Sequence, residues 1–366
     1  MKDFLIVGAG LFGSVFARLA TDNGYSVTVI DRREHIAGNI YTKRESNIDI
    51  HVYGPHIFHT NSDVIWKFVN QYTEFNQYHH SPKVKNGDNI YSFPINLLTL
   101  HQIFGCVTPN DAKDVLERIR VKDVDPESNL ENYCIHHVGH LLYNTFFHGY
   151  TLKQWGKEPK DLPASIIKRL PIRFNYNDNY YKDKYQAIPK NGYTELISNM
   201  LDGIDVKLGI DFFKERKQLE DTHKNIVYSG ALDQLFNYKL GKLEWRSLEF
   251  KNEWLDVEDY QGCSIINYTN KSIPYTRITE HKHFNLRSTD KTIITKEYPV
   301  LYSEGKEQYY SINDSINNEL QKKYLQMLPS NYIVGGRLGS YQYYDMDQII
   351  GMALNKFNSM HNNKSA

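Results

Sequence analysis

Residues 4–31 read FLIVGAGLFGSVFARLATDNGYSVTVID, and this stretch decides the fold of the first part of the chain. The opening apolar run FLIV predicts a buried strand, and the apolar residues at positions 11–20 recur at helical spacing. Gly24 marks the end of that helix, and a second apolar run ends at Ile30. The order of strand, helix and strand predicts the start of a parallel, doubly wound sheet.

Three glycines join the first strand to the helix in G-x-G-x-x-G spacing. We expect Gly8 to permit a tight turn, Gly10 to let backbone N–H groups approach a pyrophosphate, and Gly13 to let helix and strand pack closely. The helix N-terminus adds partial positive charge. Asp31 follows the second strand, where its carboxylate can accept both ribose hydroxyls and would repel the 2′-phosphate of NADP. The stretch therefore predicts a site for FAD or NAD.

The segment RREHIAGNIY at residues 32–41 distinguishes these two cofactors. Its Gly38-Asn39 turn suits a second close approach of the backbone to a long dinucleotide. The segment is similar to the flavin-binding fold shared by amine oxidases and hydroxylases, which usually carries GGN where this chain has Ala37 first. We therefore expect FAD, with an ordinary loop between strands as the alternative for this segment.

Composition limits the classes of function that the chain can have. Its 366 residues exceed what one hydrophobic core organises, so two or three domains are expected. Lys plus Arg and Asp plus Glu number 43 each, which removes the main electrostatic argument for nucleic acid. No apolar run approaches the roughly 20 residues of a membrane span, and the N-terminus lacks a secretory pattern, so we expect a cytoplasmic protein with no membrane attachment. The cysteines are too few for a disulfide framework.

Hydrophobic periodicity predicts three kinds of region in the rest of the chain. One kind is helical, a second is formed of antiparallel strands, and a third completes the nucleotide-binding sheet. Helices are expected over residues 62–72, 96–105, 109–120, 130–147 and 192–201, antiparallel strands over 172–189, 243–250, 263–269, 275–284 and 292–298, and strands of the nucleotide-binding sheet over 204–212 and 225–230.

The expected fold class is therefore α/β. It combines an FAD-binding, doubly wound, Rossmann-like domain with an inserted helical domain and an inserted antiparallel β-sheet domain. The domain boundaries expected are residues 1–78, 190–240 and 325–366 for the FAD-binding domain, 95–168 for a helical substrate domain, and 79–94, 169–189 and 241–324 for the sheet domain.

A second glycine loop follows a short apolar run near the C-terminus. Residues 335–347 read GGRLGSYQYYDMD and lead into a helical pattern. We expect Asp345 or Asp347 to cap that helix, whose dipole would favour the negative charge of a reduced flavin. An ordinary capped terminal helix is the alternative.

These stretches resemble one family over nearly the whole chain, bacterial UDP-galactopyranose mutase. The resemblance is carried by HVYGPHIFHTN, SFPINL, GYTLKQWG, LPASIIKRLPIRFNYNDNYY, YQGCSIINYT, PYTRITEHKHF, TKEYP and GRLGSYQYYDMD, whereas Gln342 stands where the family often has a basic residue. It implies interconversion of UDP-galactopyranose and UDP-galactofuranose. In that reaction N5 of reduced FAD attacks the anomeric carbon, and the sugar ring opens and recloses with no net redox change.

The resemblance implies a site for the uridine, the diphosphate and the sugar. The end of an aromatic helix matches the uridine pocket, with core packing as the alternative for Phe146. Arg169 and Arg277 match two arginines that clamp the diphosphate, because a planar guanidinium fits phosphate oxygens in a way that a lysine does not. The substrate-binding residues implied are Phe146, Phe147, Tyr150, Thr151, Trp155, Arg169, Tyr180, Arg277, Tyr310 and Tyr343.

The resemblance also implies the residues that hold the flavin and act on the sugar. The histidine-rich stretch at residues 51–59 invites a metal site, but no carboxylate or thiolate has zinc-site spacing, so no metal is expected. In the family this turn lies against the flavin ring. The cofactor-binding residues implied are Gly8, Gly10, Phe12, Gly13, Asp31, Arg32, Gly38, Asn39, His56, Val206, Arg337, Asp345 and Met346, and the catalytic residues are Arg169, Arg277, His59, Arg337 and Asp345.

The resemblance implies as partners the two UDP-sugars, an external reductant for the flavin, and a second copy of the chain in a homodimer. Two other classes compete with this interpretation. A redox flavoenzyme would use the same fold with a hydride donor and an electron sink, and a noncatalytic carrier of prenylated GTPases would lack the KQWG and TRITEHKHF strings. Reduced protein that forms a furanose product from UDP-galactose would distinguish the mutase from both.

Overall fold

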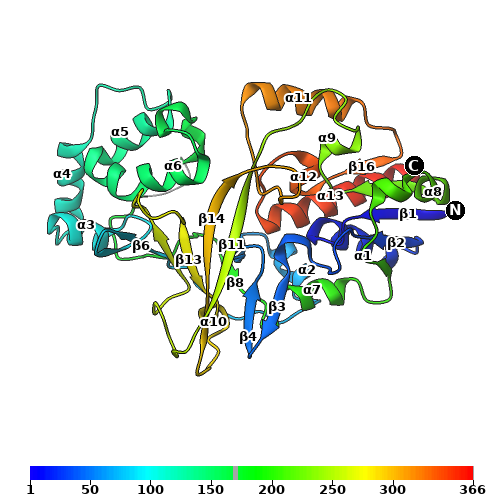
Figure 1. Cartoon of the computed structure of the whole chain (residues 1–366), viewed down its shortest axis with the longest axis horizontal. Coiled ribbons are helices and arrows are strands. Elements are labelled where there is room, and N and C mark those ends of the chain that lie inside the picture. The colour runs from blue at the N-terminus through cyan, green and yellow to red at the C-terminus, as the bar shows by residue number, and fades with distance from the viewer. Residues whose placement is uncertain (168–171, 366) are drawn as a thin grey trace. The chain divides into compact units, whose positions relative to one another are not determined.

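The computed structural model describes residues 1–167 and 172–365 of the chain (Figure 1). The chain folds into two compact units. The first contains residues 1–77, 183–246 and those from Glu304 onward, and the second contains residues 78–182 and 247–303. Residues 183–189, 241–246 and 304–324, which we expected in the sheet domain, belong to the first unit. Within it the strand at 185–187 pairs with residues 58–60, and residues 310–311 pair with Trp245 and Arg246.

The first unit is built on a five-stranded sheet in the order β16-β10-β1-β2-β9, with every pairing parallel. The helix that follows β1 returns the chain to β2, as the opening stretch predicts. This parallel order confirms the expected doubly wound fold. The strands are β1 (Lys2–Val7), β2 (Val27–Ile30), β9 (Asp205–Lys207), β10 (His223–Tyr228) and β16 (Tyr332–Val334).

Side chains of β1 alternate between two hydrophobic layers, one on each face of this sheet. Phe4 and Ile6 pack in a core with α1, α7 and α13, while Leu5 packs in a second core with Phe212 and Tyr228. Helix α13 packs against α1, and Figure 1 shows the two helices in the same part of the first unit. The helices of this unit are α1 (Leu11–Asp22), α2 (Asp63–Val69), α7 (Tyr193–Met200), α8 (Phe212–Thr222), α9 (Leu232–Leu235), α11 (Ser315–Gln326), α12 (Gly336–Ser340) and α13 (Met346–Ser365).

Small strand pairs complete the first unit. Strand β3 (Thr42–Glu45) pairs with β4 (Ile48–His51), and β5 (Phe58–Thr60) pairs with β8 (Tyr185–Ala187). Strand β15 (Tyr310–Ser311) pairs with the first residues of β11. All three pairs are antiparallel.

The second unit contains strands in the order β11-β14-β13-β12-β6-β7. Strands β12 and β13 pair antiparallel, as expected, but β12 pairs with β6 in parallel, so the sheet is mixed. The strands are β6 (Lys83–Asn86), β7 (Asn89–Ser92), β11 (Trp245–Leu255, whose first two residues belong to the first unit), β12 (Ile265–Tyr268), β13 (Arg277–Glu280) and β14 (Thr292–Leu301).

Most helices of the second unit share one hydrophobic core. These are α3 (Leu97–Phe104), α4 (Pro109–Ile119), α5 (Leu130–Leu142), a π-helical turn at Tyr143–His148 and α6 (Gly149–Trp155). The short α10 (Lys282–Asn285) lies outside that core. Among the described residues no helix combines the length and the apolar character needed to cross a bilayer.

Strand β13 ends in a fully buried carboxylate, Glu280. Its oxygens accept hydrogen bonds from the N–H groups of Tyr260 and Gln261 and from the hydroxyl of Thr292, and the His283 ring lies 3.5 Å away. Burial opposes the charge, but these contacts outweigh burial and lower the pKa of Glu280 to about 2. The carboxylate therefore fixes the loop before β12 against β13.

Candidate functional site

The first glycine loop has the close approaches that the sequence predicts. A Cβ at Gly13 would lie 2.0 Å from the carbonyl oxygen of Gly8, so only glycine lets α1 start this close to β1. Gly8 has φ +109° and Gly38 has φ +53°, and a Cβ at Gly38 would lie 3.0 Å from the α-carbon of Gly10. Backbone from residues 8–13 and from residue 38 thus forms one cradle with little side-chain bulk.

Asp31 ties the end of β2 to this loop. The N–H of Ala9 donates to Oδ2 at 2.8 Å, and the N–H of Arg33 donates to Oδ1 at 2.9 Å. The carboxylate is therefore held in place by two backbone donors, at the position where a ribose would be recognised.

Ala37, where the flavin-binding fold usually has glycine, adopts a left-handed conformation with φ +74°. The residue is completely buried, and its N–H donates to the carbonyl oxygen of Ala9 at 2.8 Å. A left-handed alanine costs roughly 1–2 kcal/mol relative to its usual conformations. The hydrogen bond to the glycine loop holds the residue in this conformation, so the departure from GGN leaves the local backbone in the form that glycine favours.

A cavity lies over this cradle, entirely within the first unit, and its roughly 1330 Å³ of empty space is partly open to solvent. Most of the predicted cofactor-binding residues line it: Gly8, Gly10, Phe12, Asp31, Arg32, Gly38, Asn39, His56, Arg337 and Met346. Gly13 instead packs under the loop, and Val206 lies on β9, the edge strand of the sheet, where it pairs with Val29. The prediction missed further lining residues, which include Arg33, Asp211, Phe212, Phe213, Ser229 and Glu307.

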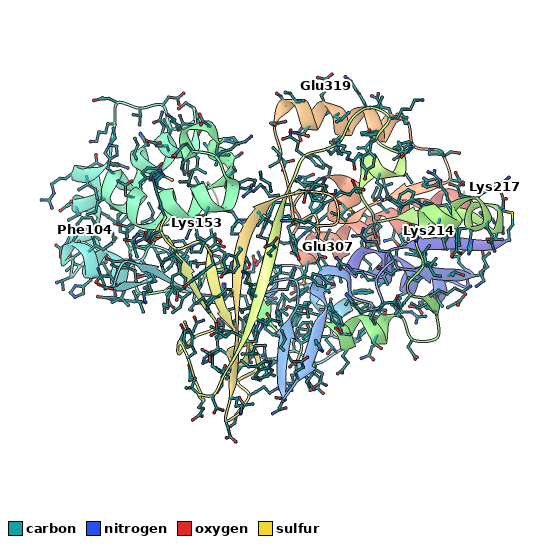
Figure 2. All side chains as sticks on the ribbon, in the orientation of Figure 1. Phe104, Lys153, Lys214, Lys217, Glu307 and Glu319 are labelled. Atoms are coloured by element: carbon teal, nitrogen blue, oxygen red, sulfur yellow. The ribbon has the colours of Figure 1, made fainter. Side chains whose placement is uncertain are left out.

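Glu307, which is labelled in Figure 2, pairs with both arginines that follow Asp31. Its carboxylate lies 2.7 Å from the guanidinium of Arg33 and 3.1 Å from that of Arg32. Arg33 also donates to Oδ1 of Asn39 at 2.8 Å and stacks 4.3 Å from the ring centre of Tyr53. Segments far apart in the chain therefore form one polar wall of the cavity.

The three histidines of the stretch at residues 51–59 have separate partners. Nδ1 of His59 lies 2.5 Å from Oδ2 of Asp183. The other carboxylate oxygen of Asp183 accepts a hydrogen bond from the side chain of Asn61. The His56 ring bonds the carbonyl oxygen of Gly54 at 2.8 Å, and the His51 ring accepts from the His56 N–H at 3.1 Å. Of the three, His56 lines the cavity.

The second glycine loop packs on the first. A Cβ at Gly335 would lie 2.1 Å from the ring of Phe12, so the loop needs glycine there. Arg337 donates to the carbonyl oxygen of Tyr344 at 2.7 Å and stacks 4.3 Å from the ring centre of Tyr343. The ring of Tyr343 stacks in turn on that of Tyr310, with the centres 5.7 Å apart. The structure therefore brings together the three predicted residues Arg337, Tyr343 and Tyr310.

Helix α13 begins directly after this loop. The N–H of Asp345 donates to the side chain of Gln348 at 2.9 Å, and the carboxylate of Asp347 accepts from the N–H of Gln348 at 2.7 Å. Met346 lines the cavity, whereas Asp345 does not. Asp345 directly precedes the helix, and the Gln348 side chain bonds back to its N–H, as in half of a capping box, whereas Asp347 lies within the first turn.

In the second unit, Arg277 and Tyr150 lie together. A guanidinium nitrogen of Arg277 is 3.4 Å from the hydroxyl of Tyr150, and its Nε is 3.1 Å from the carboxylate of Glu297. Burial raises the pKa of Glu297, and the ion pair with Arg277 acts in the opposite direction. The guanidinium is thus fixed along one edge, and its side chain stays 21% exposed. A partly exposed, oriented guanidinium is suited to binding a phosphate.

The other predicted substrate residues of this unit differ in burial. Phe146 is 3% exposed and packs with Tyr91 and Phe93, so its contacts are those of a core residue. Phe147 and Thr151 are also buried, whereas Tyr150, Trp155 and Tyr180 are half-buried. Arg169 lies outside the described residues.

Two comparisons of the sequence bear on the family. A family model described as UDP-galactopyranose mutase matches residues 145–343. The probable UDP-galactopyranose mutase of Klebsiella pneumoniae is 42% identical over 361 residues, which are 96% of this chain and 93% of that protein. The chain belongs to the UDP-galactopyranose mutase family. Members of this family are isomerases, so the chain is an enzyme of that class.

Three other comparisons concern a relative with a different printed name, the fold, and the nucleotide-binding domain. The dTDP-fucopyranose mutase of Escherichia coli is 37% identical over 97% of each chain. A crystal structure of reduced UDP-galactopyranose mutase has the same fold, with a TM-score of 0.73 and 13% identity over 99% of this chain and 96% of that one. A second family model, the NAD(P)-binding Rossmann-like domain, matches residues 6–72. Membership of the mutase family implies a flavin in this domain, and the glycine cradle beside Asp31 fits it.

Proposed function

We propose that this chain is a flavin-dependent mutase that interconverts UDP-galactopyranose and UDP-galactofuranose with no net redox change. The observation that carries the proposal is the guanidinium of Arg277, held by buried Glu297 beside Tyr150, in a chain of this family. A fixed guanidinium next to an aromatic helix matches the two chemically distinct parts of UDP.

In this proposal the first unit holds FAD. Backbone N–H groups at the start of α1 would face its pyrophosphate, and Asp31 would accept hydrogen bonds from its ribose. Arg33 and Asn39 are fixed by their mutual hydrogen bond and would bound the same cavity. When bound in its reduced form, FAD supplies the nucleophile for the anomeric carbon of the sugar.

The residues of the second unit would act on the nucleotide. Arg277 would bind the diphosphate and stabilise the negative charge that grows on it as the bond to the sugar breaks. The ion pair with Glu297 keeps the guanidinium oriented before substrate arrives, so little reorganisation is needed. We propose the same diphosphate role for Arg169, as the family resemblance implies.

A second candidate substrate is dTDP-fucopyranose, because a relative with that name is 37% identical over nearly the whole chain. The two candidates differ in the nucleobase, in the ribose 2′-hydroxyl and in the sugar. Residues that contact a diphosphate serve either substrate equally well, so Arg277 does not distinguish them.

The test supplies dithionite-reduced, FAD-loaded protein with each nucleotide sugar in parallel and separates the products by anion-exchange chromatography. The proposal predicts a furanose product from UDP-galactose at a kcat/KM above that for dTDP-fucose. A higher kcat/KM for dTDP-fucose would make dTDP-fucose the assigned substrate, and the chain would still be a mutase. Absence of furanose from both sugars would overturn the proposal.

A further inference from the structure

Lys153, which is labelled in Figure 2, lies on α6 and has its ammonium group among backbone carbonyl oxygens. The distances from Nζ are 2.7 Å to Tyr268, 3.1 Å to Asn270, 3.0 Å to Ile273 and 2.8 Å to Tyr275. All four oxygens belong to the end of β12 and the loop that leads to β13. The ammonium group has three protons, so the four acceptors share its positive charge.

The positive charge of Lys153 stabilises the conformation of the loop between β12 and β13. Carbonyl dipoles that point at one centre repel one another unless a cation lies there. The loop forms a turn at Asn270, whose side-chain oxygen accepts a hydrogen bond from the N–H of Ser272 at 2.9 Å. Without the ammonium, carbonyl oxygens of a half-buried loop would lose their donor, which costs more than an exposed hydrogen bond.

Packing at the start of α6 joins the same loop to the helix. A Cβ at Gly149 would lie 2.0 Å from the carbonyl oxygen of Thr269, so helix and loop touch backbone to backbone. The Thr269 hydroxyl donates to the carbonyl oxygen of Thr145 at 2.7 Å, just before α6. Two independent contacts, one at each end of α6, therefore hold the loop on the helix.

The joined segments carry the two groups that we assign to the nucleotide. Tyr150 lies on α6 one turn before Lys153, and Arg277 follows two residues after Tyr275. We propose that Lys153 is a positioning residue, which binds the loop to α6 and thereby sets the spacing between Tyr150 and Arg277 that a uridine diphosphate requires. This inference rests on the proposed function, because it takes the uridine diphosphate as the ligand of this pair.

The charged and titratable groups near the Lys153 ammonium are tyrosines, a lysine, and the ion pair of Arg277 with Glu297. The loop contributes Tyr268, Tyr275 and Lys271, and β13 contributes Arg277 with its partner Glu297 on β14. Burial raises the pKa values of Tyr268 and Tyr275 above their usual range. Burial lowers the pKa of Lys153 to about 8, within the range of ordinary binding assays. Raising the pH should therefore neutralise Lys153 before either tyrosine ionises.

The experiment measures UDP binding to the FAD-loaded full chain by calorimetry at pH 7 and pH 9. Lys153→Met should raise the Kd for UDP roughly tenfold or more, and Lys153→Arg, which keeps a cation, should stay nearer wild type. Wild type should bind more weakly at pH 9 by a larger factor than Lys153→Arg, whose guanidinium does not titrate there. Lys157→Met, at an exposed lysine four residues further on and past the end of α6, is the matched control and should bind as wild type does.

The outcomes separate the inference from the proposed function. If wild type binds UDP and Lys153→Met binds it equally well, the positioning role is wrong. If Lys153→Met fails to fold, equal pH dependence of wild type and Lys153→Arg would overturn the inference on its own. If wild type does not bind UDP at all, the proposed function fails together with the inference.

Discussion

Replacing Asp31 by asparagine tests how the first unit holds its dinucleotide. The carboxylate accepts one hydrogen bond from the N–H of Ala9 and another from the N–H of Arg33. Asparagine has one carbonyl oxygen, so one of these N–H groups would face an NH₂ donor. Because a hydrogen bond to a charged group contributes about 1.5–3 kcal/mol, we expect a loss of that order in the cradle.

That free energy corresponds to a Kd for FAD about 10- to 100-fold above wild type, at 1.4 kcal/mol per factor of ten. Apo protein is titrated with FAD, and binding is followed by quenching of flavin fluorescence. Asp205→Asn is the matched control, because Asp205 lies in the same sheet and accepts from Lys2 and Thr28 but does not line the cavity. An Asp31→Asn protein that binds FAD with the affinity of the control would refute the reasoning.

Three further predictions concern catalysis, packing and acid stability. Arg277→Ala should lower kcat by roughly 10²-fold or more, because the diphosphate loses its fixed cation; turnover near wild type would remove Arg277 from the mechanism. Gly13→Ala should lower the free energy of unfolding by about 1–3 kcal/mol, since its Cβ would meet backbone at 2.0 Å, whereas Gly351→Ala places its Cβ in ordinary contact and should not; equal melting temperatures would contradict this. The pKa of Glu280 is lowered from 4.5 to about 2, so its stabilisation of about 3 kcal/mol is complete above pH 4.5 and is lost as the pH falls towards 2. The stability difference between wild type and Glu280→Gln, from urea unfolding, should shrink over that pH range, and a constant difference would show that the charge of Glu280 does not matter.

The opening part of the fold was predictable because its signals are local. The strand at residues 4–7, the glycine spacing and the helix after it each follow from neighbouring residues, and the carboxylate of Asp31 ends the next strand as expected. Ser62 caps α2 as its position predicts, accepting from the N–H of Ile65. Short-range periodicity and capping need no tertiary information.

The strand prediction for residues 172–189 was mostly wrong, because polar side chains there compete with the backbone hydrogen bonds of a sheet. Of residues 172–189, only 185–187 form a strand. The side chains of Asn175 and Asn177 accept from the N–H groups two residues further on, which turns the chain. Residues 282–284, predicted as the end of a strand, belong instead to the short helix α10. The helix α8 was missed because its sequence FFKERKQLEDT has few apolar residues after the first turn.

The least predictable parts of the candidate site are contacts between distant segments. Glu307 meets Arg33 across more than 270 positions, and nothing in the local sequence marks Glu307 as part of the cavity. Lys153 could be taken for an exposed lysine from its sequence alone, because its carbonyl acceptors lie over 110 residues further on. Such contacts depend on tertiary packing, which periodicity does not encode.

The central claim is that reduced flavin is used without being consumed while a UDP-sugar is isomerised. In the most direct measurement, the FAD-loaded protein is reduced once and the excess reductant is removed under anaerobic conditions. UDP-galactofuranose is then added in large excess. The account predicts many molecules of UDP-galactopyranose per flavin, with the flavin spectrum still reduced at the end. Product limited to one molecule per flavin, or a flavin that becomes oxidised as product forms, would contradict it.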